Sequence, residues 1–359
     1  MSLLTIQENV SLAPLTTLQV GGAARYLAEL RREDEVQEAA QFAKARDLSL
    51  FVLGGGSNLV VADSGWPGLV LKIAIGGIAT PATSDATGNT VLFSVGAGAN
   101  WDDFVAQTIV QNCAGVECLS GIPGSVGGTP VQNVGAYGQE VAATIESVRA
   151  FDLKQDRIVV LPKPACGFRY RTSIFNSTER GRYIILRVNY RLKRGGAPSL
   201  KYADLQKYFA ENAVGQKTPP SLAEVREAVR EIRRSKGMLL VPGDDDCRSA
   251  GSFFKNPVLT EEQFKELAER AESKGLEIPS YPALNAQRKV AAAWLVEHSG
   301  FSKGYAAGPA GISQKHALAL INRRAAKASD IVGLKDEIQR AVQEAWGIQL
   351  EPEPVFVGF

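Results

Sequence analysis

Two glycine-rich segments of the chain have the composition of loops that bind phosphate groups through backbone amides. The first, GGGSN at residues 54–58, directly follows the apolar run LSLFVL at residues 48–53. Three successive glycines let backbone N–H groups converge on an anion without obstruction by Cβ atoms, as a diphosphate requires. A flexible turn would have the same composition, so this segment alone leaves both interpretations open.

The second segment, SGIPGSVGGTPVQNVGAYG at residues 120–138, contains six glycines together with hydroxyl and amide side chains. Ordering so long a glycine-rich loop costs backbone entropy, and an ordered ligand is a natural reason for it. A mobile surface loop is the alternative, but two prolines and several apolar residues favour a packed one. No GxxxxGK[ST] motif occurs, and VGAGANW at residues 95–101 lacks the third glycine of a dinucleotide fingerprint. The residues thus predict a phosphorylated cofactor held by backbone amides outside a Rossmann turn.

A third segment, AGSFFKNP at residues 250–257, places polar side chains around a pair of phenylalanines. The aromatic rings favour burial, whereas Ser252, Lys255 and Asn256 need hydrogen-bond partners. The pattern fits an ordinary strand edge. It equally fits a serine held in a dry pocket because its hydroxyl takes part in chemistry.

Helices and strands alternate in the N-terminal half of the chain, which must hold the two glycine-rich segments. Residues 33–46 have apolar side chains at helical spacing, and Asn100 is suited to cap a helix that begins at Trp101. Residues 183–192 alternate apolar and polar side chains, the pattern of a half-buried strand. Further strands are expected at 48–53, 69–73, 91–95, 145–151 and 157–161.

Helices dominate the C-terminal half, where two of them begin at capping boxes. Ser221 is followed by Glu224 at the spacing at which each side chain can accept a hydrogen bond from the other residue's backbone amide. A short helical piece is expected within 195–209, and a helix from Ser221 through about Ser235. A second box, formed by Thr260 and Gln263, begins a helix over 261–273. Two further helices are expected, one near 287–299 and one from a cap at Ser329 to about Trp346. The final stretch, IQLEPEPVFVGF, has strand character interrupted by two prolines.

Length and charge restrict the classes of protein. At 359 residues the chain is too long for one typical compact core, so two or three domains are expected. A formal net charge of +2 gives no electrostatic case for binding nucleic acid or an anionic membrane. We find no signal peptide and no run of about 18 apolar residues, which predicts a cytoplasmic protein without a membrane partner.

Cysteine and histidine usage argues against a metal centre. The four cysteines show neither a CxxC pair nor zinc spacing, which favours free thiols in a reducing compartment. The chain has only two histidines, His298 and His316. We therefore expect no bound metal.

The ordered set of motifs resembles the UDP-N-acetylenolpyruvoylglucosamine reductase (UDP-N-acetylmuramate dehydrogenase) family, flavoenzymes of peptidoglycan precursor synthesis and so of cell-wall biogenesis, cell shape and cell division. The long glycine-rich segment combined with YR-x-S-x-F and GS-x-F-x-NP is highly specific, and the resemblance runs nearly end to end. The matching stretches are TLQVGGAARY (17–26), LGGGSN (53–58), GAGANW (96–101), SGIPGSVGGTPVQNVGAYGQE (120–140), CGFRYRTSIF (166–175), AGSFFKNP (250–257), AGISQKHALALIN (310–322) and LEPE (350–353).

The resemblance implies an α+β fold in which an FAD-binding module of the vanillyl-alcohol-oxidase (PCMH) type is followed by a C-terminal α+β substrate-binding domain. Tyr202 resembles the tyrosine of the family subtype in which a Tyr-bearing loop closes over the substrate. The protein is expected to act as a monomer. The implied boundaries are 1–75 and 76–214 for the two FAD-binding subdomains, with the Tyr-loop connection at 195–214, then 215–347 for the substrate-binding domain and 348–359 for a C-terminal strand that returns to the active site.

The resemblance also implies which residues contact FAD. Backbone amides of the first glycine-rich segment would hold its diphosphate, and the second segment would wrap the flavin and the phosphates, which accounts for both clusters together. The implied FAD-binding residues are Gly54, Gly55, Gly56, Ser57, Asn58, Ser120, Gly121, Ile122, Pro123, Gly124, Ser125, Gly127, Gly128 and Thr129.

In the implied reaction NADPH reduces FAD, and the hydride then passes from flavin N5 to the enolpyruvyl ether of UDP-N-acetylglucosamine enolpyruvate, giving UDP-N-acetylmuramate. A vinyl ether accepts a hydride only if its carboxylate delocalises the developing charge, which calls for a cation beside that carboxylate. Arg171 matches the family's catalytic arginine, Ser252 its proton donor and Glu353 its catalytic carboxylate. Without the resemblance, Arg171 would be interpreted as a surface charge at a strand edge and Glu353 as a solvated acid near the terminus.

Five further residues align with the family's substrate contacts. Lys236 follows a basic helix end, REIRRSK, where it could neutralise a diphosphate or complement the helix dipole. Val355 stands where members often carry a basic residue, and His316 stands where some carry glutamine. The implied substrate-binding residues are Tyr170, Tyr202, Lys236, Asn256 and His316.

Two other functions compete with this interpretation. The first is an FAD oxidase of alcohols or sugars, which often attaches flavin covalently through histidine or cysteine; neither histidine lies in the glycine-rich module, although three cysteines do. The second is a non-catalytic flavin or nucleotide-sugar binding protein. The intact Arg171, Ser252 and Glu353 argue against it.

Overall fold

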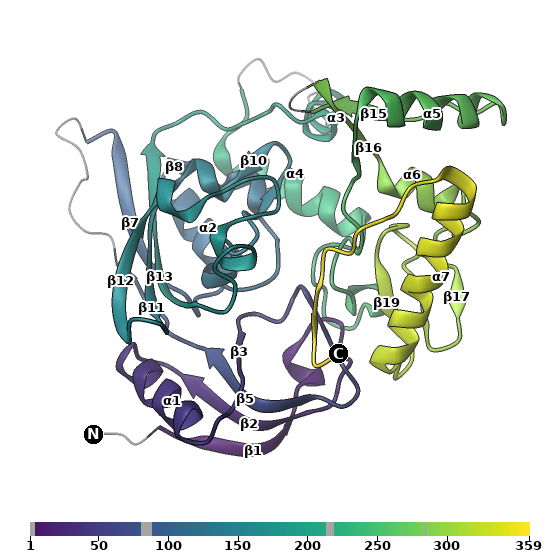
Figure 1. Ribbon diagram of the computed structural model, residues 1–359. Coiled ribbons are helices and arrows are strands. Elements are labelled where there is room, and N and C mark those ends of the chain that lie inside the picture. The colour runs from purple at the N-terminus through teal and green to yellow at the C-terminus, as the bar shows by residue number, and fades with distance from the viewer. Residues whose placement is uncertain (1–3, 80–87, 213–218, 284–285) are drawn as a thin grey trace. The chain divides into compact units, whose positions relative to one another are not determined.

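The computed structural model describes residues 4–79, 88–212, 219–283 and 286–359. The chain forms two compact units, each built from several segments (Figure 1). The first unit comprises Met1–Val10, Ala24–Gly56 and Pro67–Ser235. The second comprises Ser11–Ala23, Ser57–Trp66 and Lys236–Phe359.

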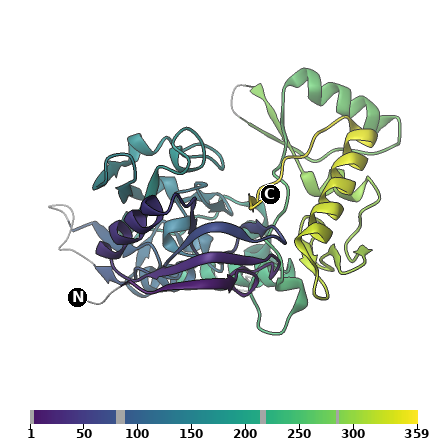
Figure 2. The same ribbon diagram turned by 60° about the horizontal axis from the view of Figure 1, so that its bottom comes forward.

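A four-stranded sheet with a covering helix opens the first unit. Its elements are β1 (Ile6–Ser11), β2 (Ala23–Leu30), α1 (Asp34–Ala45), β3 (Leu50–Leu53) and β5 (Trp66–Ile73). The strands lie in the order β1-β2-β5-β3, with β3 parallel to β5. Helix α1 buries Val36, Ala39 and Ala43 in a core that it shares with β5, and Figure 2 shows this purple helix along one face of the strands. The predicted helix over 33–46 is thus confirmed.

A second, antiparallel sheet follows in the chain. Its strands are β6 (Ile78–Ala79), β7 (Thr90–Gly96), β8 (Cys113–Ala114), β11 (Ile145–Asp152), β12 (Arg157–Pro162) and β13 (Tyr183–Arg194). They lie in the order β12-β11-β13-β7-β6, with β8 also beside β13. Strand β13 buries Ile184, Leu186 and Val188 at every second position, as predicted, but Ile185 on the opposite face is buried as well.

Helix α2 (Trp101–Val110) covers this sheet through aromatic packing. The Asn100 side chain accepts a hydrogen bond from the amide of Asp103 at 3.1 Å, which confirms the predicted cap. The rings of Trp101 and Phe104 lie 5.9 and 5.0 Å from the ring of Tyr190 on β13, all three fully buried. The helix that leads into the second glycine-rich segment is therefore fixed to the sheet.

Two helices close the first unit, α3 (Ala203–Asn212) and α4 (Leu222–Ser235). The predicted capping box is present at the start of α4, because the amide of Glu224 donates to Ser221 Oγ and the amide of Ser221 donates to the Glu224 carboxylate. The apolar face of α4 is buried against Cys118 and Tyr137. Helix α4 therefore belongs to the first unit, whereas the sequence-based boundary at residue 215 assigned it to the substrate-binding domain.

In its described residues, the second unit is built from short strands and three α-helices. Its core includes Phe253, Phe254 and the apolar face of its longest helix. One two-stranded parallel pair joins segments about 300 residues apart, because Val355–Val357 pairs with Leu59–Val61. The elements are β4 (Leu59–Val61), β14 (Val258–Leu259), α5 (Glu261–Glu272), β15 (Ser280–Pro282), β16 (Arg288–Val290), α6 (Ala292–Glu297), β17 (Ala306–Ala307), β18 (Ala310–Ile312), β19 (Leu320–Asn322), α7 (Ala328–Trp346) and β20 (Val355–Val357).

Two helix predictions in this unit need correction. The helix expected near 287–299 is only α6, because Arg288–Val290 forms strand β16 between β14 and β15. Ser329 does not cap α7, which begins one residue earlier. The backbone amides of Ser329 and Ala328 instead donate to the carboxylate of Asp63, at 3.1 and 2.7 Å. The capping carboxylate thus comes from a distant segment of the chain.

No helix within the described ranges is both long and apolar enough to span a bilayer. The cytoplasmic location and the monomeric state stay predictions.

We predict that Asp63→Ala lowers the free energy of unfolding by about 1 kcal/mol, because two amides at the start of α7 lose their acceptor while solvent exposure of Asp63 limits the effect. Asp63→Asn keeps one acceptor oxygen, so its free energy of unfolding should fall by less. Urea unfolding followed by tryptophan fluorescence, to which Trp346 at the end of α7 contributes, measures both. Equal stability of all three proteins would contradict the capping role.

The effect should depend on pH. Burial opposes ionisation of Asp63, but hydrogen bonds from Ser329 and Ala328 outweigh it and hold the pKa of the carboxyl below its ordinary value. A lowered folded-state pKa gives stability that is present above the unfolded pKa of about 3.9 and is lost as the pH falls through the folded pKa. The difference in the free energy of unfolding between wild type and Asp63→Ala should therefore become smaller as the pH falls below about 3.9.

Candidate active site

The two glycine-rich segments meet backbone to backbone in the first unit. A Cβ atom added to Gly55 would lie 2.5 Å from Gly124 Cα and 2.8 Å from the Ser125 amide nitrogen. A Cβ atom on Gly54 would lie 2.7 Å from Ser125 Oγ. A side chain at position 55 would overlap the backbone of the second segment, so this close approach requires Gly55. The structure thus brings together two clusters about 70 residues apart in the chain.

The second segment is packed onto its neighbours. The amides of Val126 and Gly127 donate to the carbonyls of Ala99 and Ala97, at 2.9 and 2.8 Å. The amide of Trp101 donates to the Gly124 carbonyl at 3.1 Å. The segment leading into α2 therefore carries the second glycine-rich segment, and the expectation of a packed loop is confirmed.

Charged residues of α2 and α4 hold the start of this loop. The Asp102 carboxylate accepts hydrogen bonds from the Gly121 amide at 2.6 Å, from Arg226 at 2.5 and 2.9 Å and from Arg230 at 2.5 Å. The buried guanidinium of Arg233 donates to the Gly121 carbonyl at 3.1 Å. Burial opposes ionisation of Asp102, but the hydrogen bonds from Arg226 and the Gly121 amide and the charges of Arg226 and Arg230 together outweigh it, so the pKa of the carboxyl lies below its ordinary value.

Sequence reasoning missed this network and treated the arginines only as a basic helix end. The signal that could have found it is spacing, because Arg226, Arg230 and Arg233 recur at intervals of four and three on one face of the predicted helix. A charged stripe of that kind needs an acidic partner.

Ser125 provides the test of whether this junction suits a phosphorylated cofactor. Its hydroxyl oxygen is buried and has no hydrogen-bond partner within the part of the chain that the structure describes. A buried hydroxyl without a partner is costly in a folded protein unless a ligand supplies one. Its position between two glycine-rich backbones fits a diphosphate, which offers only acceptor oxygens.

Two other predicted cofactor hydroxyls are already used inside the protein. Ser120 Oγ donates to the Glu117 carbonyl at 2.6 Å. Thr129 Oγ1 bonds the Val126 carbonyl at 2.9 Å and lies 2.7 Å from the Tyr190 hydroxyl. These two hydroxyl groups stabilise the conformation of the loop. Ser120 and Thr129 would therefore contact a cofactor through atoms other than these hydroxyl groups.

Arg171 lies at the tip of a tight turn in the first unit. Arg169 and Thr172 exchange backbone hydrogen bonds at 2.9 and 3.1 Å across the turn. Arg171 has φ +54°, a left-handed conformation that is uncommon for a residue with a Cβ atom. Its guanidinium donates to the Gly135 carbonyl at 3.0 Å and lies 5.5 Å from the centre of the Tyr170 ring. Tyr170 and Arg171 thus share one turn, beside the end of the second glycine-rich segment.

Asn176 supports the turn through both ends of its amide. Its Nδ2 donates to the Arg171 carbonyl at 3.1 Å, and its Oδ1 accepts from the Ser173 amide at 2.9 Å. The side chain therefore holds Arg171 in its unusual backbone conformation. No sequence motif pointed to Asn176.

Tyr202 also belongs to the first unit, where its side chain is 43% exposed. Its ring packs edge to face against Tyr137, with 5.5 Å between the ring centres. The predicted Tyr-bearing segment therefore rests on the second glycine-rich segment.

The second unit contains Ser252 between buried aromatic rings and a histidine. Ser252 Oγ lies 3.2 Å from His316 Nε2. The adjacent Phe253 and Phe254 are at most 1% exposed and pack edge to face, which fixes the backbone that carries the serine. The amide of Glu353 donates to the Phe253 carbonyl at 2.9 Å. Ser252, His316 and the segment of Glu353 therefore come together in one unit.

His316 is uncharged at neutral pH. Burial lowers the pKa of its imidazole to about 4, and the positive charges of Lys236 and Lys303 act in the same direction. A neutral imidazole has one donor and one acceptor nitrogen. It can therefore either give a hydrogen bond to the Ser252 hydroxyl or take one from it.

The remaining predicted residues of this unit have structural contacts as well. Asn58, at the end of the first glycine-rich segment, donates from Nδ2 to the Glu353 carbonyl at 3.3 Å, and its own carbonyl accepts from the Val355 amide at 2.9 Å. Asn256 Oδ1 accepts from the amide of Ala292 at the start of α6, at 2.9 Å. Ser57 and Lys236 belong to the same unit.

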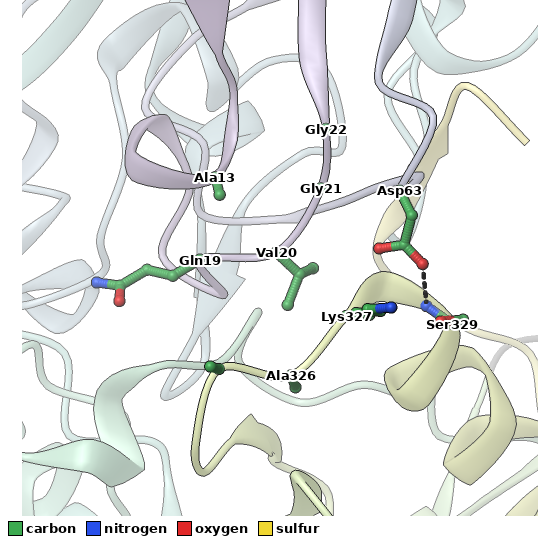
Figure 3. A pocket seen from close by; sticks show the side chains of 10 residues that line it. Ala13, Gln19, Val20, Gly21, Gly22, Asp63, Ala326, Lys327 and Ser329 are labelled. Atoms are coloured by element: carbon green, nitrogen blue, oxygen red, sulfur yellow. Dashed lines mark hydrogen bonds between the residues drawn. The ribbon is translucent and has the colours of Figure 1, made fainter.

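A hollow of about 610 Å³ in the second unit lies apart from these residues (Figure 3). Its lining includes Gln19, Gly21, Gly22, Asp63 and Lys327, and none of the predicted site residues. The Asp63 carboxylate points toward Ser329, whose amide it binds. In the described ranges we find no group of three or more His, Cys, Asp or Glu side chains that could hold a metal ion.

Comparison with known proteins identifies the class first. Residues 24–161 match the family model of the FAD binding domain, so the glycine-rich junction belongs to an FAD-binding domain and the protein is an FAD-dependent oxidoreductase. Residues 242–357 match the model of the C-terminal domain of UDP-N-acetylenolpyruvoylglucosamine reductase.

Full-length relatives identify the family. The chain is 44% identical to the UDP-N-acetylenolpyruvoylglucosamine reductase of Thermobifida fusca, over 98% of both chains. It is 43% identical to that of Streptomyces coelicolor, over 98% of this chain and 91% of the relative. The crystal structure of the Thermus caldophilus reductase superposes with a TM-score of 0.66 at 25% identity, over 99% of this chain and 100% of that one. The chain belongs to the UDP-N-acetylenolpyruvoylglucosamine reductase family.

The predicted family, the α+β fold class and the FAD cofactor are thereby confirmed. The protein is an oxidoreductase of a family that acts in peptidoglycan precursor synthesis.

We predict that Gly55→Ala weakens FAD binding by about 10- to 100-fold, because the new Cβ would overlap the backbone of Gly124 and force the two glycine-rich segments apart. The ratio of flavin absorbance to protein after dialysis measures this loss. Gly76→Ala is the matched control, since a Cβ atom there meets nothing within 4 Å. An unchanged flavin content in Gly55→Ala would refute the close-approach requirement.

Proposed function

We propose that the protein uses NADPH to reduce the enolpyruvyl ether of UDP-N-acetylglucosamine enolpyruvate to UDP-N-acetylmuramate. The observation that carries this proposal is the position of Ser252, whose hydroxyl is held beside His316 and close in the fold to Glu353. Family membership over the full length supports the same substrate and reductant.

FAD would be held by backbone amides of Gly54–Gly56 and of the loop that begins at Ser120, with Ser125 Oγ as a side-chain donor. The chemistry that FAD supplies when bound is the storage of a hydride taken from NADPH until the enolpyruvyl group arrives.

Arg171, Ser252 and Glu353 would act on the substrate. The Arg171 guanidinium would neutralise charge that develops on the enolpyruvyl carboxylate, and its rigid fork suits a carboxylate. The Ser252 hydroxyl would give its proton to the carbon next to the one that receives the hydride. Glu353, in the segment that binds the Phe253 carbonyl, would polarise the enolate.

The direct assay is anaerobic and follows the visible absorbance of the flavin. NADPH should bleach the flavin, and UDP-N-acetylglucosamine enolpyruvate should then restore its colour. If that substrate fails to reoxidise wild-type protein, the proposed function is wrong.

Ser252→Ala should leave bleaching by NADPH intact and slow reoxidation by the substrate by about 10²- to 10⁴-fold, because only the second step needs the serine proton. Stopped-flow absorbance measures both half-reactions. Ser273→Ala is the control, since that exposed hydroxyl only binds a backbone carbonyl of its own helix. Equal losses in both half-reactions of Ser252→Ala would assign the residue a structural role instead.

Asn176 tests the role of Arg171. Asn176→Asp keeps the oxygen that accepts from the Ser173 amide but removes the donor to the Arg171 carbonyl, so reoxidation should slow by about tenfold while NADPH still bleaches the flavin. The same stopped-flow experiment applies. Wild-type reoxidation in Asn176→Asp would show that the turn holds Arg171 without this hydrogen bond.

A further inference from the structure

An acidic side chain lies at the start of the second glycine-rich segment. Asp102, in the first turn of α2, accepts a hydrogen bond from the Gly121 amide at 2.6 Å. The residue before it, Trp101, donates its amide to the Gly124 carbonyl at 3.1 Å, and Gly124 is the residue that Gly55 approaches. Consecutive Cα atoms are about 3.8 Å apart, so Asp102 is one residue from the glycine junction. A carboxylate beside a diphosphate repels it unless another group compensates its charge.

Two arginines of α4 provide that compensation. Arg226 binds both carboxylate oxygens of Asp102, at 2.5 and 2.9 Å, and Arg230 binds one of them at 2.5 Å. The three side chains are between 15% and 28% exposed, so solvent screens their charges only in part. Because the guanidinium groups outnumber the carboxylate, the cluster as a whole is positive and attracts an anion.

The other polar group of Gly121 is also held by a charged side chain. Its carbonyl accepts from Nε of Arg233 at 3.1 Å, and Arg233 is buried. Gly121 has φ +71°, so the chain turns sharply where it enters the second glycine-rich segment. Helices α2 and α4 thus hold this entry from both sides through charge-assisted hydrogen bonds. The Gly121 amide is used inside the protein.

We propose that Asp102 is a positioning residue for FAD, and that the diphosphate of FAD tolerates its negative charge only because Arg226 and Arg230 neutralise it. This inference rests on the proposed placement of the diphosphate between the two glycine-rich segments. It adds residues outside those segments that set the affinity for FAD. One consequence is asymmetric: loss of an arginine harms FAD binding only while the carboxylate is present.

The test removes the two charges singly and together, and equilibrium dialysis of the holoenzyme against graded FAD measures the dissociation constant. Arg226→Met should raise this constant by about tenfold, because the carboxylate loses its bidentate partner. Arg226→Met combined with Asp102→Asn should return to within about threefold of wild type, since asparagine still accepts from the Gly121 amide but carries no charge. Arg226→Lys keeps the positive charge and should also stay within about threefold.

Two exposed residues on the same helices supply matched controls. Asp103→Asn removes a carboxylate from the first turn of α2, and Arg234→Met removes a guanidinium from the last turn of α4. Neither should change the dissociation constant of FAD by more than about twofold. A loss in Arg234→Met equal to that in Arg226→Met would assign the effect to the total charge of α4 and overturn the proposal.

Two further results contradict the neutralising role. One is wild-type affinity in Arg226→Met. The other is a double variant that binds FAD no better than Arg226→Met alone, which would mean that the cluster only joins the two helices. Thermal unfolding at saturating FAD shows whether each variant folds. If Arg226→Met does not fold, Arg230→Met removes the second partner of Asp102, and the same comparison with Asp102→Asn applies.

Failure of this inference can be told apart from failure of the proposed function. Gly55→Ala tests the placement of the diphosphate and leaves the charged cluster intact. If Gly55→Ala releases FAD while Arg226→Met retains it, only the role of the cluster is wrong. If Gly55→Ala keeps its flavin, the placement itself is wrong. The anaerobic assay with the enolpyruvyl substrate decides the proposed reaction separately, because the dialysis experiment uses no substrate.

Discussion

The close approach of Gly55 to Gly124 is the constraint on which the first unit depends. Two loops can touch backbone to backbone only where neither carries a Cβ atom, and each loop must then be held in place by its neighbours. Strand β3 delivers the first loop, whereas the segment leading into α2 and the arginines of α4 hold the second. The arrangement explains why a helix so far along the chain as α4 packs in the first unit.

The second unit meets a different requirement, which is to hold the polar Ser252 hydroxyl next to buried aromatic rings. The buried side chains of Phe253 and Phe254 fix the backbone that follows Ser252. The amide of Glu353 donates to this backbone at the Phe253 carbonyl. The His316 imidazole lies 3.2 Å from the Ser252 oxygen. The rigidity of this segment therefore comes from apolar burial, while the hydroxyl has a polar neighbour.

Features encoded by neighbouring residues were predicted well from the sequence. The caps at Asn100, Ser221 and Thr260 and the alternation in β13 all depend on spacings of two to four residues. Features that depend on distant partners were not. Asp63 binds the start of α7 across 265 residues, and Arg226 meets Asp102 across 124. Similarly, Arg288–Val290 is drawn into a sheet by two partner strands, which overrides its local helical pattern. The family motifs identified Ser252, but not its contact with His316.

The pairing of β4 with β20 has a consequence for biosynthesis. Strand β4, with its apolar Val60 and Val61, leaves the ribosome about 300 residues before the strand that completes it. At roughly 5–20 residues per second, this segment waits about 15 to 60 s for its partner. During that interval an apolar strand edge is open to wrong pairing, so the nascent chain is a natural client for chaperones, and completion of the second unit must follow release of its last strand.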